Sequence, residues 1–570
     1  MNEPLNIFEA PLDAINLIEA SAGTGKTYAI TGLYLRLLIE RGYRAGDILV
    51  VTYTRAATEE LKERIHKRLL ESRQVFQQET GGDPFYREML QRYPDRRQAI
   101  RRLNKAILAF DEAAIFTIHG FCQRVLTDTA FASGIPLATT ILADDSPVLQ
   151  EIIEDFWRRR CHDIPPRWAN HLIDSNIDPA ALRTGIQPHL NKPYLSIAEL
   201  VALEDLTTLE PPFEAAFHKA RRLWLNHHDE VQDLLLNNTS LNRGTYNDGM
   251  VKWFIDLDEY FEQDEHPHPR CPEKFINFTT SMLAKRVNRN KMPPRHVFFD
   301  ACEELHGVAD RLRETLDHYL LKLRQELLLY CNQELPRRKR RLQVQSYDDL
   351  LLNLQTALAD PRQGAPLAEN VRQRFAAALI DEFQDTDPTQ YGIFQAIYRD
   401  SGQPIFLVGD PKQAIYSFRG ADIFAYLQAR QHAGQAHTLV TNWRSDPGLI
   451  QAVNALFSHR PQSFLLEQIP FQTVEAADRE RPYLVTGDDA PAPLHFWFVE
   501  PDDDGKRHDK GDINPRLAQA TAGRIALLLN LARQGEAYIA ESGRRRPLSG
   551  GDIAVLVRDH HQARLVRKAL

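Results

Sequence analysis

A glycine-rich stretch near the N-terminus has the residue types and spacing that can bind phosphate. It reads Glu-Ala-Ser-Ala-Gly-Thr-Gly-Lys-Thr over residues 19–27, between a short apolar run and a leucine-rich segment with helical spacing. In such a strand–loop–helix, backbone N–H groups and the start of the helix form a cradle for anions. The ammonium group of Lys26 suits the β- and γ-phosphates of a nucleotide, and the hydroxyl of Thr27 can ligate Mg²⁺. We therefore predict an ATP and Mg²⁺ site formed by Ala20, Ser21, Ala22, Gly23, Thr24, Gly25, Lys26 and Thr27.

One position departs from the usual phosphate-binding pattern. Ala20 stands where the first glycine is normally found. A methyl group is tolerated there if the residue has a negative φ, so the prediction is kept. The alternative interpretation is a glycine-rich turn between two ordinary elements.

Two acidic residues follow an apolar run in the second half of the chain. Asp381 and Glu382 come directly after residues 375–380, which are typical of a buried strand. A nucleotide hydrolase needs a carboxylate for its metal and a base for the attacking water. We predict that Asp381 holds Mg²⁺, directly or through water, and that Glu382 orients and deprotonates the water. A solvated acidic turn is the alternative.

Three further polar side chains also follow apolar runs. Arg444 comes after residues 438–440, and its guanidinium could reach the γ-phosphate as an arginine finger, a group worth on the order of 10³–10⁵ in rate. Gln384 and Gln413 are neutral groups that suit a sensor of the γ-phosphate. Catalytic roles are therefore predicted for Lys26, Asp381, Glu382, Gln413 and Arg444.

Aromatic rings lie next to these polar groups in the sequence. Stacking of a base on an exposed ring contributes roughly 1–3 kcal/mol and needs no particular base sequence. Each ring taken alone is more often a core residue than a stacking platform, and His119 could be a phosphate contact or a core histidine. The recurrence of rings at three run ends favours single-stranded DNA as the ligand. The rings are Tyr53, Phe121, Tyr416 and Phe418.

The apolar runs that precede these groups must form the scaffold. They alternate with helical segments, which predicts an α/β fold with a parallel sheet. Ligands of such sheets bind outside the carboxyl ends of the strands, where the polar clusters fall. The runs are 15–18, 48–53, 114–118, 375–380, 404–408 and 438–440.

The chain changes character twice along its length. A mostly helical stretch rich in Trp, Arg and His interrupts the sheet, and a second α/β domain begins later, with a helix at 516–534 and a strand at 552–558. The basic run 337–341 is either a solvated helix face or a phosphate-contacting patch. The predicted parts are a sheet domain (1–125 and 316–445), a helical insertion (126–315) and the start of a second domain (446–570).

Composition limits the classes of protein. The 570 residues have a net charge of −8, 43% hydrophobic residues and 26% charged residues, which describes a soluble globular protein. No global basic field draws it to nucleic acid, so DNA contacts must use local grooves. Five cysteines without metal-binding spacing indicate a reducing compartment, without disulfides or structural zinc. Without a signal sequence or a long apolar run, we expect a cytoplasmic protein with no membrane partner.

The order of the motifs resembles that of superfamily 1 helicases of the UvrD/Rep type, and most closely their RecB branch, the exodeoxyribonuclease V beta subunits. The likeness runs from about residue 10 to the end and covers helicase motifs I, Ia, Ib, II, III and IV. The segments that carry it are 19–27, 51–54, 116–122, 380–387, 408–422 and 441–445.

The resemblance implies two RecA-like domains with ATP bound between them, the first interrupted by a helical insertion and the second incomplete. It implies an ATP-dependent 3′→5′ helicase on single-stranded DNA and duplex ends, working with RecC- and RecD-like subunits in double-strand break repair and recombination. The residues that match the family's ATP-site motifs keep the roles given above. The DNA track implied by position consists of Tyr53, Thr54, His119, Phe121, Tyr416 and Phe418.

Three departures from the family pattern bear on these expectations. Asp13 stands in place of a glutamine that contacts adenine in relatives, which affects base selectivity. Motifs V and VI and the C-terminal nuclease pattern are not found, so we expect a truncated RecB-type chain whose cleft neutralises transition-state charge incompletely. The alternatives are an ATP-gated DNA-binding or assembly fragment without motor activity, and a stand-alone UvrD-like repair helicase. The long insertion and the Thr-Ile-His-Gly-Phe-Cys string at 117–122 favour the RecB type over the latter.

Overall fold

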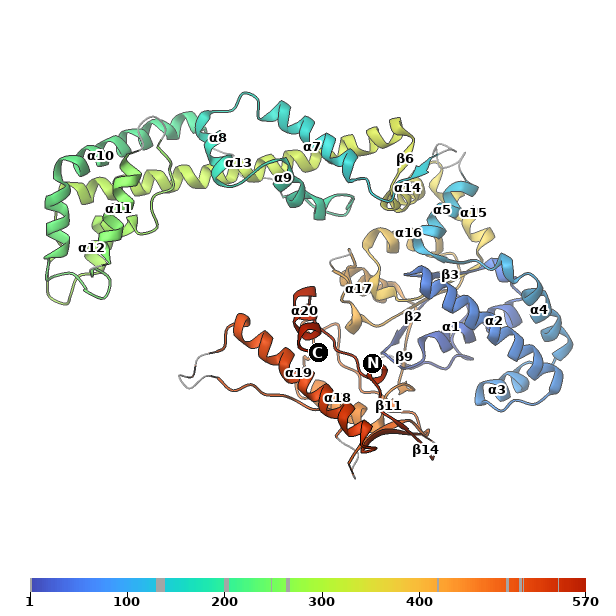
Figure 1. The fold of residues 1–570 in the computed structure, drawn as a ribbon. Helices are drawn as coiled ribbons and strands as arrows, with labels where there is room; N and C mark the ends of the chain where they lie inside the picture. The colour runs from blue at the N-terminus through green and yellow to red at the C-terminus, as the bar shows by residue number, and fades with distance from the viewer. Residues whose placement is uncertain are drawn as a thin grey trace. The chain divides into compact units, whose positions relative to one another are not determined.

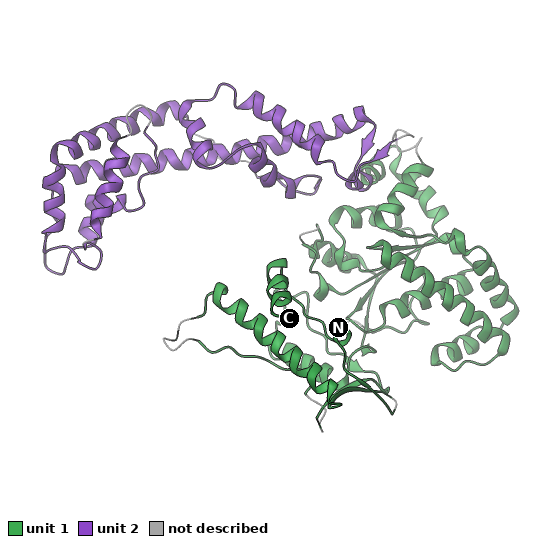
Figure 2. Ribbon diagram, in the orientation of Figure 1, with its two compact units in different colours: residues 1–135, 353–570 green, residues 136–352 purple. Residues whose placement is uncertain are grey.

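The computed structural model divides into two compact units (Figure 2). One unit consists of residues 1–135 and 353–570, and the other of residues 136–352. The second unit begins and ends later along the chain than the insertion expected at 126–315, and its long helix Val297–Leu342 continues past residue 315. The structure describes residues 3–129, 139–198, 204–247, 249–262, 267–417, 420–487, 492–501, 505, 507–541 and 543–570.

The first unit is built on a seven-stranded sheet in the order β1-β9-β2-β8-β7-β3-β4. Figure 1 labels β2, β3 and β9 of this sheet, with α1 and α2 beside them. Every neighbouring pair is parallel, which confirms the predicted α/β fold. The central strands β2, β3, β7 and β8 are buried along almost their whole length and are mostly apolar, because helices cover both faces of the sheet. The strands are β1 (Glu3–Pro4), β2 (Ile15–Ala20), β3 (Ile48–Thr52), β4 (Ile115–Thr117), β7 (Ala377–Ile380), β8 (Ile405–Gly409) and β9 (Gln435–Leu439).

Helices follow most of these strands and pack on the two faces of the sheet. One face carries α1, α2 and α4, whose apolar side chains join one core cluster with β2, β3 and β8. Side-chain caps start several helices directly after strands, for example Thr54, which accepts a hydrogen bond from the N–H of Ala57. The helices are α1 (Lys26–Arg36), α2 (Arg55–Gln78), α3 (Pro84–Arg92), α4 (Arg96–Leu108), α5 (Ile118–Asp128), α15 (Gly364–Arg374), α16 (Pro388–Tyr398) and α17 (Ile423–His432).

The rest of this unit is less regular. Two short strands, β10 (Thr441–Asn442) and β11 (Glu475–Ala476), pair in parallel. An antiparallel sheet joins β12 (Tyr483–Thr486), β13 (Ala537–Glu541) and β14 (Arg544–Pro547). The predicted helix is present as α19 (Lys510–Arg533), between α18 (Pro447–Ser458) and α20 (His560–Ala569). The strand predicted at 552–558 is wrong, because this stretch pairs with no other described strand and most of its side chains are exposed.

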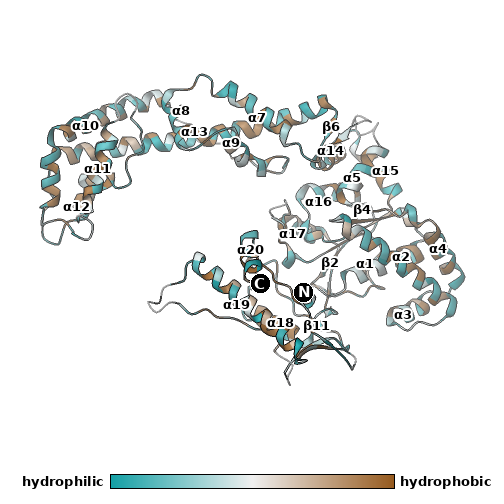
Figure 3. Cartoon of the chain, in the orientation of Figure 1, coloured by the Kyte–Doolittle hydropathy of each residue, from teal (hydrophilic) through white to brown (hydrophobic). Residues whose placement is uncertain are grey.

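The second unit is helical, as predicted for the insertion. Its core is one cluster in which the 46-residue α13 (Val297–Leu342) packs along the other helices. Figure 3 shows apolar and polar stretches alternating along these helices, as expected for helices with one buried face. The remaining elements are β5 (Thr140–Ile141), α7 (Ser146–Arg160), α8 (Pro166–Asp174), α9 (Pro179–Ile186), α10 (Leu206–Leu236), α11 (Met250–Phe261), α12 (Thr280–Lys285), β6 (Val344–Gln345) and α14 (Tyr347–Ala359), which crosses the unit boundary.

The basic run at the end of α13 is mostly engaged in ion pairs within this unit. Arg337 pairs with Glu334, and Arg338 pairs with Asp155. Lys339 is buried, with its Nζ 2.9 Å from Oδ2 of Asp349. These contacts favour the helix-face interpretation over a phosphate patch. Among the described residues, no helix is both long and apolar enough to cross a membrane.

Candidate nucleotide site

The glycine-rich loop connects the end of β2 to the start of α1. Gly23 and Gly25 have φ of 79° and 95°, in the left-handed region that favours glycine. Thr24 folds the loop back through its N–H and hydroxyl, which donate to the carbonyl of Ser21 at 3.2 and 2.7 Å. Ala20 ends a regular strand and is not among the residues with positive φ, so its methyl group is accommodated. The loop therefore holds the shape of an anion cradle at the N-terminus of α1.

The predicted lysine and acidic residues meet at this loop. Nζ of Lys26 lies 2.7 Å from Oε2 of Glu382, although 356 residues separate the two in sequence. Asp381 follows β7 directly, and its N–H donates to the carbonyl of Val51 in the neighbouring β3. Glu382 has a φ of 50°, which is rare for a residue other than glycine. The chain thus leaves β7 through a left-handed turn at the residue whose carboxylate contacts Lys26.

The electrostatics of this cluster suit a divalent cation. Burial and the adjacent charge of Glu382 raise the pKa of Asp381 to about 6. The same two causes raise the pKa of Asp385 to about 6, and its buried Oδ1 has no hydrogen-bond partner among the described residues. Three carboxyl groups thus face the single charge of Lys26. A metal ion beside Asp381 and the hydroxyl of Thr27 would relieve this excess of negative charge.

The two predicted glutamine sensors belong to the same hydrogen-bond network. Gln384 donates from Nε2 to Oε2 of Glu382 at 2.7 Å, and its Oε1 accepts from the N–H of Asp410 at 2.9 Å. Gln413 donates from Nε2 to Oδ2 of Asp410 at 2.7 Å. A Cβ on Gly409 would lie 2.6 Å from Oε1 of Gln384, so only glycine leaves room for this network. The structure therefore links the acidic pair to the loop that follows β8.

The segment of the predicted arginine finger lies against the glycine-rich loop. The N–H of Trp443 donates to the carbonyl of Gly23 at 2.7 Å, and Nδ2 of Asn442 donates to that of Ala22 at 3.0 Å. Arg444 is exposed, and its Cβ lies 2.7 Å from the position that a Cβ on Gly23 would occupy. The five predicted catalytic side chains thus all come from segments at one edge of the sheet, linked to this loop directly or through the glutamine network.

Sequence reasoning missed two aromatic side chains beside this loop. Tyr28 and Trp443 are 41% and 52% exposed. A Cβ at Gly25 would lie 3.7 Å from Cβ of Tyr28 and 3.8 Å from Cδ1 of Trp443. Exposed rings on either side of a phosphate cradle can contact the base of a nucleotide. The aromatic residue directly after Gly-Lys-Thr, and the one directly before Arg444, were the available signals.

The predicted DNA-binding residues lie in different environments in the structure. The rings of Tyr53 and Tyr416 stack with their centroids 6.0 Å apart, so the ends of β3 and β8 share one aromatic surface. Thr54 is exposed and caps α2, and His119 is partly exposed in the first turn of α5. Phe418 lies outside the described residues.

Phe121 requires a correction. It was expected to line the DNA track, but its side chain is fully buried. Its ring packs against Phe375 and Phe394, with centroid distances of 5.9 Å to each. The ring therefore belongs to the core beneath the sheet and is not available to a base.

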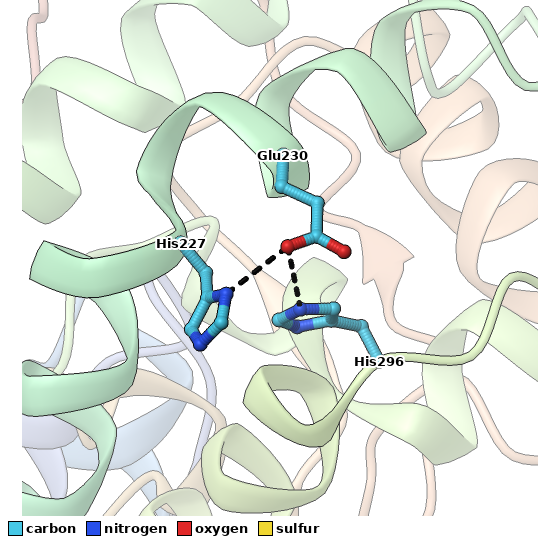
Figure 4. A group of neighbouring side chains, drawn as sticks. All are labelled: His227, Glu230 and His296. Atoms are coloured by element: carbon cyan, nitrogen blue, oxygen red, sulfur yellow. Dashed lines mark hydrogen bonds and ion pairs between the residues drawn. The ribbon is translucent and has the colours of Figure 1, made fainter.

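The other unit brings together three potential metal ligands, His227, Glu230 and His296 (Figure 4). Oε2 of Glu230 lies 3.0 Å from Nδ1 of His227 and 3.7 Å from Nε2 of His296. The N–H of Phe298 donates to Nδ1 of His296, which places the proton of the neutral ring on Nε2. A protonated Nε2 has no lone pair for a metal. We therefore interpret this cluster as hydrogen bonding at the N-cap of α13.

Comparison with known proteins agrees with this geometry. Residues 2–434 match the UvrD/REP helicase N-terminal domain. The chain is 36% identical over 583 residues to RecBCD enzyme subunit RecB of Escherichia coli, spanning 100% of this chain and 48% of that protein. It is 33% identical over 618 residues to the same subunit of Haemophilus influenzae, spanning 100% of this chain and 49% of the relative. The chain thus spans about half the length of these relatives.

Proposed function

Since the chain belongs to the UvrD/REP helicase family, we propose that it is the ATP-driven motor part of a RecBCD-like enzyme. Its substrate is single-stranded DNA at duplex ends, along which it moves 3′ to 5′ in double-strand break repair and recombination. RecC- and RecD-like subunits are its partners, because the relatives are named as subunits of a RecBCD enzyme. Its five cysteines are free thiols, which fits action in the reducing cytoplasm. One observation carries the motor assignment: Lys26 of the glycine-rich loop forms an ion pair with Glu382, the proposed base.

The residues of the site divide the work of hydrolysis. Mg²⁺ would be held by Thr27 and Asp381, and it supplies positive charge for the phosphate oxygens. Lys26 leaves Glu382 for the phosphates, and Glu382 is then available to orient the attacking water and accept its proton. Gln413 and Arg444 contact the γ-phosphate.

The loop after β8 offers a route from nucleotide to DNA. Gln413 and Tyr416 are three residues apart on this loop, and the ring of Tyr416 stacks on that of Tyr53. A change in the contact of Gln413 on loss of the γ-phosphate therefore moves a ring of the proposed DNA track. Repeated changes of this kind would advance the strand.

The test is phosphate release by the 570-residue chain with and without single-stranded DNA. We expect DNA to stimulate hydrolysis, Lys26→Ala to abolish it, and Tyr416→Ala to lower the stimulation while leaving the basal rate unchanged. If DNA has no effect and Lys26→Ala hydrolyses ATP like the wild type, the motor assignment is wrong. Binding of ATP and DNA without turnover would instead favour the ATP-gated binding fragment.

A further inference from the structure

A lysine in the loop after β8 is buried between two carboxylates. Nζ of Lys412 lies 2.7 Å from Oε1 of Glu19 and 2.8 Å from Oδ1 of Asp410. The three side chains are only 9%, 2% and 3% exposed, respectively. Burial alone would lower the pKa of Lys412, but the carboxylates of Asp410 and Glu19 raise it above its ordinary value, so the lysine stays charged. Buried charges of this kind persist only when each has its partner.

The ion triad joins two functional loops at their bases. Glu19 is the next-to-last residue of β2 and stands in register with Gly409, the last residue of β8. Asp410 follows β8 directly. Glu19 therefore marks the start of the nucleotide loop, and Asp410 marks the start of the loop that carries Gln413. Lys412 bridges the two.

Asp410 connects Lys412 to Gln413, because its carboxylate contacts both side chains. Oδ1 of Asp410 accepts from the N–H of Lys412 at 3.1 Å in addition to its ion pair with Nζ. Its Oδ2 accepts from Nε2 of Gln413 at 2.7 Å. With both oxygens engaged, the carboxylate has one orientation, and so does the amide that donates to it. Removing the lysine leaves Asp410 beside the like charge of Glu19, which favours rotation or protonation of the carboxyl group.

We propose that Lys412 is a positioning residue that sets the orientation of Gln413 through Asp410, and thereby the preference of the site for ATP over ADP. This inference rests on the proposed role of Gln413 as a γ-phosphate contact. The site distinguishes the two nucleotides only if the amide is held where the γ-phosphate will be. Lys412 itself touches neither nucleotide.

The test compares the affinities of the 570-residue chain for ADP and for a non-hydrolysable ATP analogue, each with Mg²⁺. We expect Lys412→Met to lower the ATP-over-ADP affinity ratio at least about tenfold, the value of a hydrogen bond to a charged group, with ADP affinity within about twofold of wild type. Gln413→Ala should give the same loss. The double variant Lys412→Met/Gln413→Ala should lose no more than either single variant, because both act through one contact.

Two controls separate positioning from folding. Glu19→Gln retains the pair between Lys412 and Asp410 and should keep the wild-type ratio. Glu19→Gln/Lys412→Met has the same buried net charge as the wild type, but Oδ1 of Asp410 still loses its ammonium partner. Its ATP-over-ADP affinity ratio should therefore fall as in Lys412→Met, and this variant provides the test if Lys412→Met does not fold. An unchanged ratio in a folded variant without the lysine overturns the inference. If the wild-type chain binds nucleotide no better than Lys26→Ala does, the proposed function itself is overturned.

Discussion

Replacement of Glu382 by glutamine should strengthen ATP binding and weaken hydrolysis. Nζ of Lys26 lies 2.7 Å from Oε2 of Glu382, so a bound triphosphate must take the lysine from this carboxylate. The side chains are 14% and 36% exposed, which places the pair between a buried and a surface ion pair. At 4 Å and an effective dielectric constant of 20, the Coulomb energy would be about 4 kcal/mol. Solvent screening at the more exposed carboxylate reduces the net value to about 1 kcal/mol.

If Glu382 no longer competes with ATP for Lys26, ATP binding gains about 1 kcal/mol, which corresponds to roughly fivefold tighter binding. The same substitution removes the proposed base for water, and general-base catalysis is typically worth 10²–10⁴ in rate. We therefore expect Glu382→Gln to bind a fluorescent ATP analogue about fivefold more tightly and to release phosphate at least about a hundredfold more slowly. Glu79→Gln, which removes the charge of an exposed ion pair with Arg96, is the matched control and should change neither quantity.

The discriminating result is that Glu382→Gln binds ATP more tightly and yet hydrolyses it more slowly than the wild type. Weaker ATP binding by Glu382→Gln would show that the carboxylate does not compete with the nucleotide for Lys26. Hydrolysis within about twofold of the wild type would show that Glu382 is not the base. Either result refutes the reasoning from the ion pair.

Three further predictions follow from other contacts. Asp385→Asn should raise the unfolding midpoint more at pH 8 than at pH 5, because folding raises the pKa of this carboxyl group from 3.8 to about 6 and the stability linked to its protonated form is lost as pH rises through that range, completely at pH 8 and only in part at pH 5; thermal melts at both pH values measure it, and an equal shift at both would contradict it. Gly409→Ala should lower the free energy of unfolding by about 1–3 kcal/mol in a denaturant titration, because its Cβ would lie 2.6 Å from Oε1 of Gln384; a shift below about 0.5 kcal/mol would show that the network relaxes. Tyr53→Ala and Tyr416→Ala should each weaken binding of oligo(dT) by roughly 1–3 kcal/mol in fluorescence anisotropy, less than additively because the rings touch; unchanged affinity would remove these rings from the DNA track.

The sequence was most informative where polar residues follow apolar runs. Because parallel strands end at one edge of their sheet, the sequence alone predicts that Lys26, Asp381 and Gln413 lie together. Sequence reasoning could not supply the contacts between side chains at that edge. The pair of Lys26 with Glu382 and the triad around Lys412 depend on the register of β2, β7 and β8, which the hydrophobic pattern does not determine.

Two errors have identifiable physical causes. Phe121 was read as the end of a strand, but Ile118, Phe121, Cys122 and Val125 have the spacing of one buried helix face, and α5 begins at Ile118. The apolar residues 553–557 have strand composition, yet a strand also needs a neighbour for its backbone groups, and none pairs with them among the described residues. In both cases the local pattern identified apolar residues but did not reveal the backbone conformation and the neighbours that decide whether they are buried.

The strand order has a consequence for synthesis on the ribosome. β2 and β3 emerge early, but in the finished sheet they are separated by β7 and β8, which are made only after the whole helical unit. At about 5–20 residues per second, two apolar strands wait tens of seconds for their central partners. The nascent chain therefore passes through a long interval with exposed strand edges, in which chaperone binding should matter more for the first 130 residues than for the self-contained helical unit. The two strands with which those edges finally pair also carry the catalytic acids and the sensor loop, so closure of the sheet and assembly of the nucleotide site are a single event.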